Sequence, residues 1–368
     1  MVISENYCIF IVRNYKELQI IIAMLTADKV TELFCMADDF CKFFDKMTAK
    51  YTLRSENKRP YHRDSTMSKA EIMLIMILFH DSGYRCLKHF YLEKVCKHLR
   101  ELFQKVVSYN RFVELEREVA IPLALFIKKV LLGKCTGISF VDSTPLRVCR
   151  NQRIHIHKTF NGIAQRGKCS MGWFFGFKLH LICNEKGELL NFMITPGDVD
   201  DRKPLEYKSF MEFIYGKLVG DKGYVGKELF QKLFVDGIQL ITKLKSNMKG
   251  TLMSVSDKLL LRKRAIIETV NDELKNIAQM EHSRHRCSDN FIVNMLELLL
   301  HIVCFRKAVC PMSFVHWTHS LLYFEFVELT LFILSKTPYC VYLQTSAMKK
   351  RRIILIKENS KTAIAVLL

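Results

Sequence analysis

The sequence predicts an α/β protein in which a helical segment precedes a mixed β-sheet with flanking helices. Two observations favour this order. From Thr26 to Val130 apolar residues recur at helical spacing. From Gly137 onwards the pattern changes to short apolar runs separated by turn residues, which is typical of strands. At 368 residues the chain is long enough for two domains, since roughly 150 residues make one domain.

The helical segment contains four predicted helices. Ser68 and Glu71 form a capping box before the second helix, and Ser108 is a suitable N-cap for the fourth. Short helices with Lys, Arg and Tyr near their starts resemble helix-turn-helix DNA readers, but a plain helical bundle with solvated charges fits the pattern equally well. The predicted helices cover residues 30–44, 72–79, 87–103 and 108–126.

The second segment predicts three antiparallel strands, followed by helix, strand, helix, strand and helix. This order describes an RNase H-like fold, with a mixed five-stranded sheet between flanking helices. The predicted strands cover residues 138–149, 173–183, 188–195, 218–221 and 238–243. The predicted helices cover residues 204–215, 226–235 and about 257–280.

The chain is strongly basic. It has 56 Lys and Arg against 37 Asp and Glu, a formal net charge of +19. Such a surplus favours a polyanionic partner, nucleic acid first and an anionic membrane second, although a basic protein indifferent to DNA is an alternative. The longest late apolar run, Leu321 to Leu334, contains Glu325 and Glu328, so we expect no transmembrane segment and no membrane partner.

The thirteen cysteines are scattered, odd in number and without a CxxC pair. This pattern argues for reduced thiols in a cytoplasmic protein and against a zinc site.

Three acids mark the candidate chemistry: Asp142 in GISFVDST, Asp221 in LVGDKGY and Glu268 in RAIIETVNDELK. The first two end apolar, strand-like runs, and burying an unpaired charge is costly. Two carboxylates 4 Å apart repel by about 4 kcal/mol at an effective dielectric of 20, so a cluster of acids calls for cations. Two divalent ions about 3.5–4 Å apart, held by oxygen ligands, support phosphodiester cleavage.

Cations flank the last of these acids. Arg264 lies four residues before Glu268 and Lys275 lies seven after it, so the three share a helix face on which the cations would position phosphates. For Arg264 and Glu268 alone, an ordinary surface pair is the simpler explanation. Arg284 and Arg286 follow in a basic region that would track a phosphate backbone, or that is simply a solvated face.

These motifs together resemble the DDE transposases of bacterial insertion sequences, specifically the insertion-sequence 982 family. The resemblance covers about Val30 to Phe305 and also rests on MGWFFGFKLHLICN, TPGDVDDR, LRKR, HSRHR and SYNRFVEL. It implies that Asp142, Asp221 and Glu268 form an acidic triad that binds two Mg²⁺ or Mn²⁺ ions.

Arg264 and Lys275 match the Arg and Lys of the signature Tyr-x2-Arg-x3-Glu-x6-Lys of related transposases, whereas Leu261 stands in place of the Tyr. A contact of that Tyr with DNA would be lost here. Asp198, Asp200 and Asp201 crowd one loop and offer alternative ligands, but acids after Pro-Gly are more often turn formers.

The resemblance implies a nucleoid-associated bacterial enzyme that binds double-stranded DNA at its element's terminal inverted repeats, as a homodimer or larger assembly, and catalyses cleavage and strand transfer. A DNA-binding protein that has lost catalysis and an RNase H-like nuclease without strand transfer are the alternatives. The predicted organisation is an extension (1–23), a helical DNA-binding domain (24–132), the catalytic domain (133–305) and an extension without any resemblance (306–368).

Overall fold

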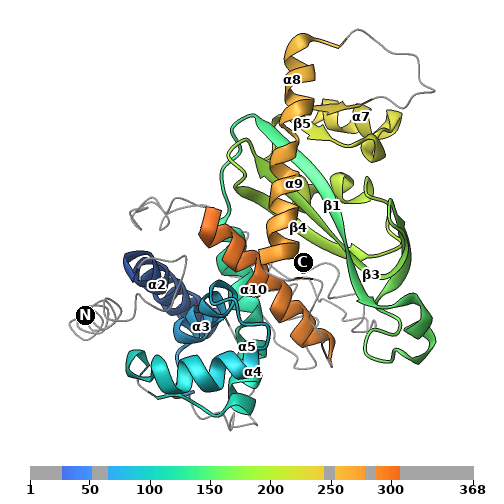
Figure 1. Ribbon diagram of the computed structural model, residues 1–368. Helices are drawn as coiled ribbons and strands as arrows, with labels where there is room; N and C mark the ends of the chain where they lie inside the picture. The colour runs from blue at the N-terminus through green and yellow to red at the C-terminus, as the bar shows by residue number, and fades with distance from the viewer. Residues whose placement is uncertain are drawn as a thin grey trace, which may run out of the picture.

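The computed structural model describes residues 27–51, 65–103, 105–243, 253–277, 280, 285 and 287–306. Within them, a group of helices lies beside a curled mixed sheet that carries further helices (Figure 1). Arg284, Arg286, the predicted N-terminal extension and all of the predicted C-terminal extension except Arg306 lie outside the described residues.

All four predicted N-terminal helices are present. The capping box is confirmed, because the backbone N–H of Glu71 donates to Ser68 Oγ (3.1 Å) and that of Ser68 donates to Glu71 Oε2 (2.6 Å). The predicted helix 87–103 is divided into an α-turn, a π-helix and a 3₁₀ turn. The elements are α2 (Ala27–Tyr51), α3 (Lys69–Asp81), α4 (Leu87–Phe90), η1 (Tyr91–His98), η2 (Arg100–Leu102), α5 (Tyr109–Phe126) and η3 (Ile127–Leu131).

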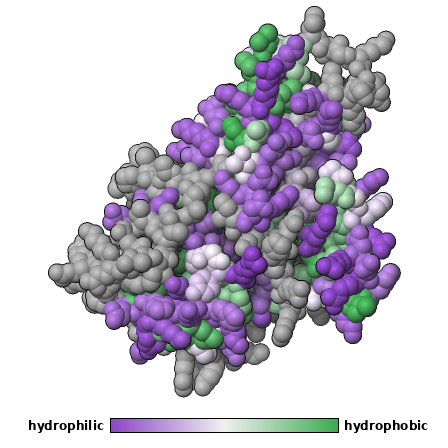
Figure 2. Space-filling view, in the orientation of Figure 1, coloured by the Kyte–Doolittle hydropathy of each residue, from purple (hydrophilic) through white to green (hydrophobic). Residues whose placement is uncertain are grey.

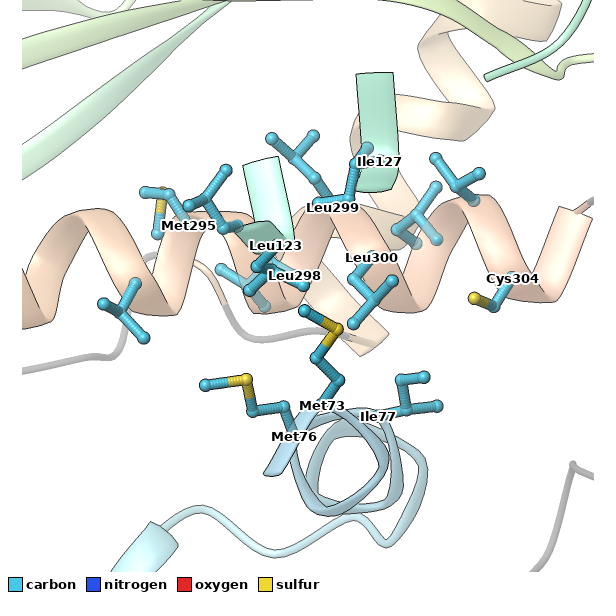
Figure 3. Packing of buried hydrophobic residues seen from close by; sticks show 14 of the residues in the cluster. Met73, Met76, Ile77, Leu123, Ile127, Met295, Leu298, Leu299, Leu300 and Cys304 are labelled. Atoms are coloured by element: carbon cyan, nitrogen blue, oxygen red, sulfur yellow. The ribbon is translucent and has the colours of Figure 1, made fainter. Parts of the chain in front are cut away.

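Helix α10 (Ser288–Arg306) returns to this group after the sheet and packs against α3, α5 and η3. Met73 and Ile77 of α3, Leu123 of α5 and Leu299 and Leu300 of α10 face one another in this core (Figure 3), and each is at most 1% exposed. The last helix of the described chain is therefore part of the same core as the first ones.

The sheet has six strands in the described part of the chain, in the order β2-β3-β1-β5-β6, with β4 also paired to β3. Strand β3 is antiparallel to β1, β2 and β4, whereas β1, β5 and β6 are parallel. The five predicted strands are present, and β2 was missed because its sequence, QRGKC, is mostly polar and exposed. The strands are β1 (Ile138–Cys149), β2 (Gln165–Cys169), β3 (Gly172–Asn184), β4 (Leu189–Pro196), β5 (Gly216–Gly220) and β6 (Ile238–Thr242).

Two predicted helices differ from those observed. The helix expected at 204–215 is only a 3₁₀ turn and a short helix, because Tyr207 between them has an extended backbone (φ −85°, ψ 121°). The long helix expected at about 257–280 is divided at Arg264 and continues as a π-helix after Asp272. The remaining elements are η4 (Asn151–Ile156), η5 (Lys203–Glu206), α6 (Lys208–Met211), η6 (Lys222–Tyr224), α7 (Lys227–Val235), α8 (Val255–Lys263), α9 (Ala265–Asp272) and η7 (Glu273–Ile277).

The alternation of side chains along β1 divides the interior into two cores. Phe140 and Leu146 belong to the larger core, which includes the N-terminal helices, α9 and α10, whereas Val141 belongs to a smaller core with α7. Helix α9 crosses the sheet on the face of the larger core (Figure 1). Among the described helices, none has the length and apolar character of a membrane span.

Candidate active site

Asp142 lies in the middle of β1, on the sheet face that α9 covers. It is opposite Leu181 of β3, and α9 contacts β1. The side-chain amide of Asn271, a buried residue of α9, donates a hydrogen bond to Asp142 Oδ2 (2.9 Å). The carboxylate of Asp142 is therefore fixed between the sheet and the helix.

Asp221 is the first residue after β5. Strands β1 and β5 are parallel, and Phe140 of β1 pairs with Val219 of β5. Asp142 follows Phe140 by two residues and Asp221 follows Val219 by two residues, so the two acids lie at the same level of the sheet. Gly220 allows the following turn to fold close to the sheet, since a Cβ atom there would lie 3.0 Å from the ring of Tyr224. The parallel pairing thus brings the first two predicted acids to neighbouring strands.

Glu268 lies on α9, one turn after Arg264, and this arginine joins two of the acids. Its Nη2 atom lies 2.5 Å from Glu268 Oε1 and its Nη1 atom lies 3.6 Å from Asp221 Oδ1. The arginine side chain is 20% exposed, whereas both carboxylates are about half exposed. One guanidinium group therefore occupies the space between acids that come from two different elements.

The pKa values follow from this arrangement. Burial raises the pKa of Asp142 to about 6; the charge of Arg264 opposes this shift, and those of Asp221 and Glu268 add to it. Burial alone would lower the pKa of Arg264, but the hydrogen bond to Glu268 and the charges of the acids raise it overall. The three acids and Arg264 are thus electrostatically coupled.

A depression of about 280 Å³ opens beside these side chains. Leu261, which stands in place of the Tyr of the transposase signature, lines it, so this position faces the site although its side chain is aliphatic. The lining residues are Gly220, Asp221, Lys243, Leu261, Arg262, Arg264, Ala265 and Glu268. Most of the side chains that line the depression are cationic or carboxylate. Such a lining suits a ligand that carries a phosphate and binds together with a metal cation.

The side chains present fit a hard divalent cation. Carboxylate oxygens are the ligands that Mg²⁺ and Mn²⁺ prefer, and the buried Oδ1 atom of Asn271 has no hydrogen-bond partner in the described residues. In the described ranges no three His, Cys, Asp or Glu side chains already form a metal-binding group. Arg264 provides the positive charge between the acids instead, so this side chain would have to move for a cation to bind.

The other predicted residues lie elsewhere. Lys275 is half-buried in η7, and no hydrogen bond or ion pair links it to Asp142, Asp221 or Glu268 in the described structure. The π-helical turn between Glu268 and Lys275 changes the spacing that would place them on one face of an α-helix.

The acids of the loop after β4 have partners of their own. Asp200 pairs with Arg202 at 2.7 Å, and Asp201 pairs with Lys178 at 2.9 Å. These contacts account for both acids without a metal ion.

Sequence reasoning missed two residues of the site. Asn271 follows Glu268 by three residues and lies on the next helical turn. Its contact with Asp142 depends on how α9 lies across β1, which the sequence pattern does not show. Lys243 follows β6 directly, and it lines the depression because β6 pairs with β5, which precedes Asp221.

One comparison with known proteins covers the segment that contains the three acids. Residues 132–288 match the family model described as a transposase DDE domain, and this range contains all three acids. Among solved structures, the chain resembles a piggyBac transposase in a synaptic complex with hairpin DNA, with 10% identity, a TM-score of 0.41, and coverage of 76% of this chain and 73% of that chain. No match was found among curated proteins.

Proposed function

We propose that the chain is a DDE transposase that cleaves and joins DNA at the site formed by Asp142, Asp221 and Glu268. The observation that carries this proposal is that Arg264 contacts both Asp221 at the end of β5 and Glu268 of α9, while Asp142 of β1 is hydrogen-bonded to Asn271 of the same helix. The match of residues 132–288 to the transposase DDE domain supports it independently.

The order of strands supports an RNase H-like reading of the sheet. Strands β4, β3 and β1 are antiparallel neighbours, and β5 and β6 continue from β1 in parallel. In this proposal, membership of the bacterial insertion-sequence 982 family rests on the ordered sequence motifs. Assembly on the terminal repeats as a homodimer or larger complex, and location at the bacterial nucleoid, follow from the same proposal.

Each residue has a proposed role. Asp142, Asp221 and Glu268 would hold two Mg²⁺ or Mn²⁺ ions, which when bound activate the attacking oxygen and stabilise the leaving oxygen. Asn271 orients the carboxylate of Asp142. Arg264 would neutralise the acids before the ions bind and would then contact a phosphate of the DNA. Lys275, Arg284 and Arg286 would contact phosphates of the same DNA outside the site.

The first test is Asp142→Asn, which keeps the size of the side chain but removes its charge. Cleavage of a duplex carrying the sequences that flank the reading frame should fall more than about 100-fold with Mg²⁺ present, because even outer partners of metal ligands contribute 10–100-fold. Asp198→Asn is the matched control, since Asp198 is exposed and lies in the loop after β4. Equal cleavage by Asp142→Asn and the wild type would refute the assignment.

The products separate the alternative functions. Strand transfer gives joined molecules, whereas a nuclease gives only nicked or cut ones. Tight, salt-dependent DNA binding without any metal-dependent nicking would instead identify a DNA-binding protein that has lost catalysis.

A further inference from the structure

The β2–β3 hairpin (Gln165–Asn184) carries a cationic and aromatic surface that the proposed site does not use. From Ser143 to Asn184 the sequence has seven Lys and Arg residues and no Asp or Glu. In a chain with 37 acids among 368 residues, an acid-free stretch of this length concentrates positive charge at one end of the sheet.

Large apolar side chains stand exposed at the same end. Trp173 is 61% exposed and Met171 is 81% exposed, and Ile156 of the neighbouring η4 is 72% exposed. Figure 2 shows isolated apolar side chains among hydrophilic ones at the lower right, where Figure 1 places this end of the sheet. A tryptophan left in water on a cationic surface suits a ligand that has both negative charge and a flat apolar face.

The cations and the ring share one face of the hairpin. Lys168 pairs with Trp173 and Arg166 pairs with Phe175, and residues paired across antiparallel strands point to the same side. Lys168 Nζ lies 5.9 Å from the centre of the Trp173 ring. Neither Lys168 nor Arg166 forms an ion pair with an acid in the described ranges, so both cations remain available to a phosphate.

Trp173 points to the same side of the sheet as Asp142, but it lies at the exposed end of that side, because Phe175, Phe177 and Leu179 between them are buried in the larger core. Asp142 is opposite Leu181 of β3, and Leu181 and Trp173 are eight residues apart, so both point to the same side of the sheet. At about 3.3 Å per residue the ring lies at most about 26 Å from that position along the strand.

We infer that Trp173, with Lys168 and Arg166, binds an unpaired base of the DNA substrate. The ring stacks on the base and the two cations bind the adjoining phosphates; unpaired bases recognised in this way stack on aromatic side chains without base-specific hydrogen bonds. This inference rests on the proposed function for its substrate, but its test does not require cleavage.

The test uses the fluorescence of Trp173 in the full chain. The sequence has two tryptophans, so Trp317→Phe leaves Trp173 as the only one. With Asp142→Asn added to prevent cleavage, a duplex with one unpaired thymine should quench the fluorescence, whereas the fully paired duplex and the same duplex with an abasic residue should not. Equal quenching by all three, or none, would overturn the inference.

Affinity measurements complete the test. In a chain that retains Trp317, Trp173→Ala should weaken binding of the duplex with the unpaired base by about tenfold to hundredfold and leave the paired duplex unchanged. Lys168→Ala should weaken both duplexes and reduce the salt dependence. Arg147→Ala is the matched control, because Arg147 is exposed but pairs with Gly176 and so lies on the opposite face. Circular dichroism checks that each variant is folded.

The outcomes separate this inference from the proposed function. Selective quenching without Mg²⁺-dependent cleavage by the wild type would leave the base site intact and refute the transposase activity. Normal cleavage with no selective quenching would refute the base site alone. A shift of the emission to shorter wavelength with anionic phospholipid vesicles, and no quenching by DNA, would show that the exposed ring serves a membrane surface and would overturn the inference.

Discussion

Asn271 is the residue that links the candidate catalytic acid of the sheet to the helix that carries Glu268. Its amide donates to Asp142 Oδ2 at 2.9 Å, and its own oxygen has no partner in the described structure. Asp142 and Asp221 could be singled out from sequence, because a carboxylate at the end of an apolar run is unusual, whereas Glu268 is singled out on a helical pattern. The Asn271 contact could not, because it depends on the crossing of α9 over β1.

Replacement of Asn271 by Ala tests this positioning role. Without the amide, the carboxylate of Asp142 is free to rotate, so the Mg²⁺ concentration for half-maximal cleavage should rise by about 10–100-fold, as is typical when an outer partner of a metal ligand is lost. A titration of cleavage against Mg²⁺ measures this change. Asn276→Ala, at an exposed position of η7, should have no effect. A lower rate with an unchanged Mg²⁺ requirement would mean that Asn271 is only structural.

Helices α8 and α9 are the elements that place a cation and an acid at the end of β5. The sequence pattern predicts one continuous helix here, but the α-helix is interrupted at Arg264, whose carbonyl oxygen accepts from Ile267 N at 3.1 Å, a spacing of three residues. Periodicity could reveal the apolar stripe of Ile267 and Val270, both buried, but not the interruption at Arg264, since both helices have the same repeat.

The two ion pairs of Arg264 predict that its replacement has a metal-dependent effect. In Arg264→Gln, Asp221 and Glu268 lose their shared counterion, and because both acids are about half exposed the loss of stability without metal should be at most about 1 kcal/mol. Mg²⁺ should then raise the melting temperature of the variant more than that of the wild type, because the ion replaces the missing charge. Thermal unfolding with EDTA and with Mg²⁺ measures the difference.

Arg111→Gln is the control for this prediction. Arg111 also binds two acids, Glu114 at 2.8 Å and Glu118 at 3.3 Å, on the exposed side of α5. Its loss should lower stability slightly and equally with and without Mg²⁺. An Arg264→Gln variant that responds to Mg²⁺ no more than Arg111→Gln would argue against a cation site between Asp221 and Glu268.

At the scale of the whole molecule, the helical group and the sheet share one hydrophobic core. This core extends from Val30 of α2 through Phe177 of β3 to Cys304 of α10. The sequence could predict both segments, because each has its own periodicity, but not the return of α10 to the N-terminal helices. The sequence of an apolar helix such as α10 does not indicate which other helices or strands it packs against.

The shared core predicts that the helical group and the sheet unfold together. Leu300 of α10 is fully buried, so Leu300→Ala should lower the free energy of unfolding by about 2–5 kcal/mol. In a Trp317→Phe background, the fluorescence of Trp173 reports on the sheet and circular dichroism reports mainly on the helices. Urea unfolding followed by both should give one midpoint, and Leu300→Ala should lower both signals together.

Leu259→Ala, at a half-exposed position of α8, is the matched control and should change the free energy of unfolding by no more than about 0.5 kcal/mol. If Leu300→Ala lowered only the helical midpoint and left that of Trp173 in place, the two parts would be independent. In that case α10 would stabilise the N-terminal helices without supporting the sheet. If the midpoints move together, a substitution in α10 far from Asp142 also reduces the fraction of chains whose site is formed.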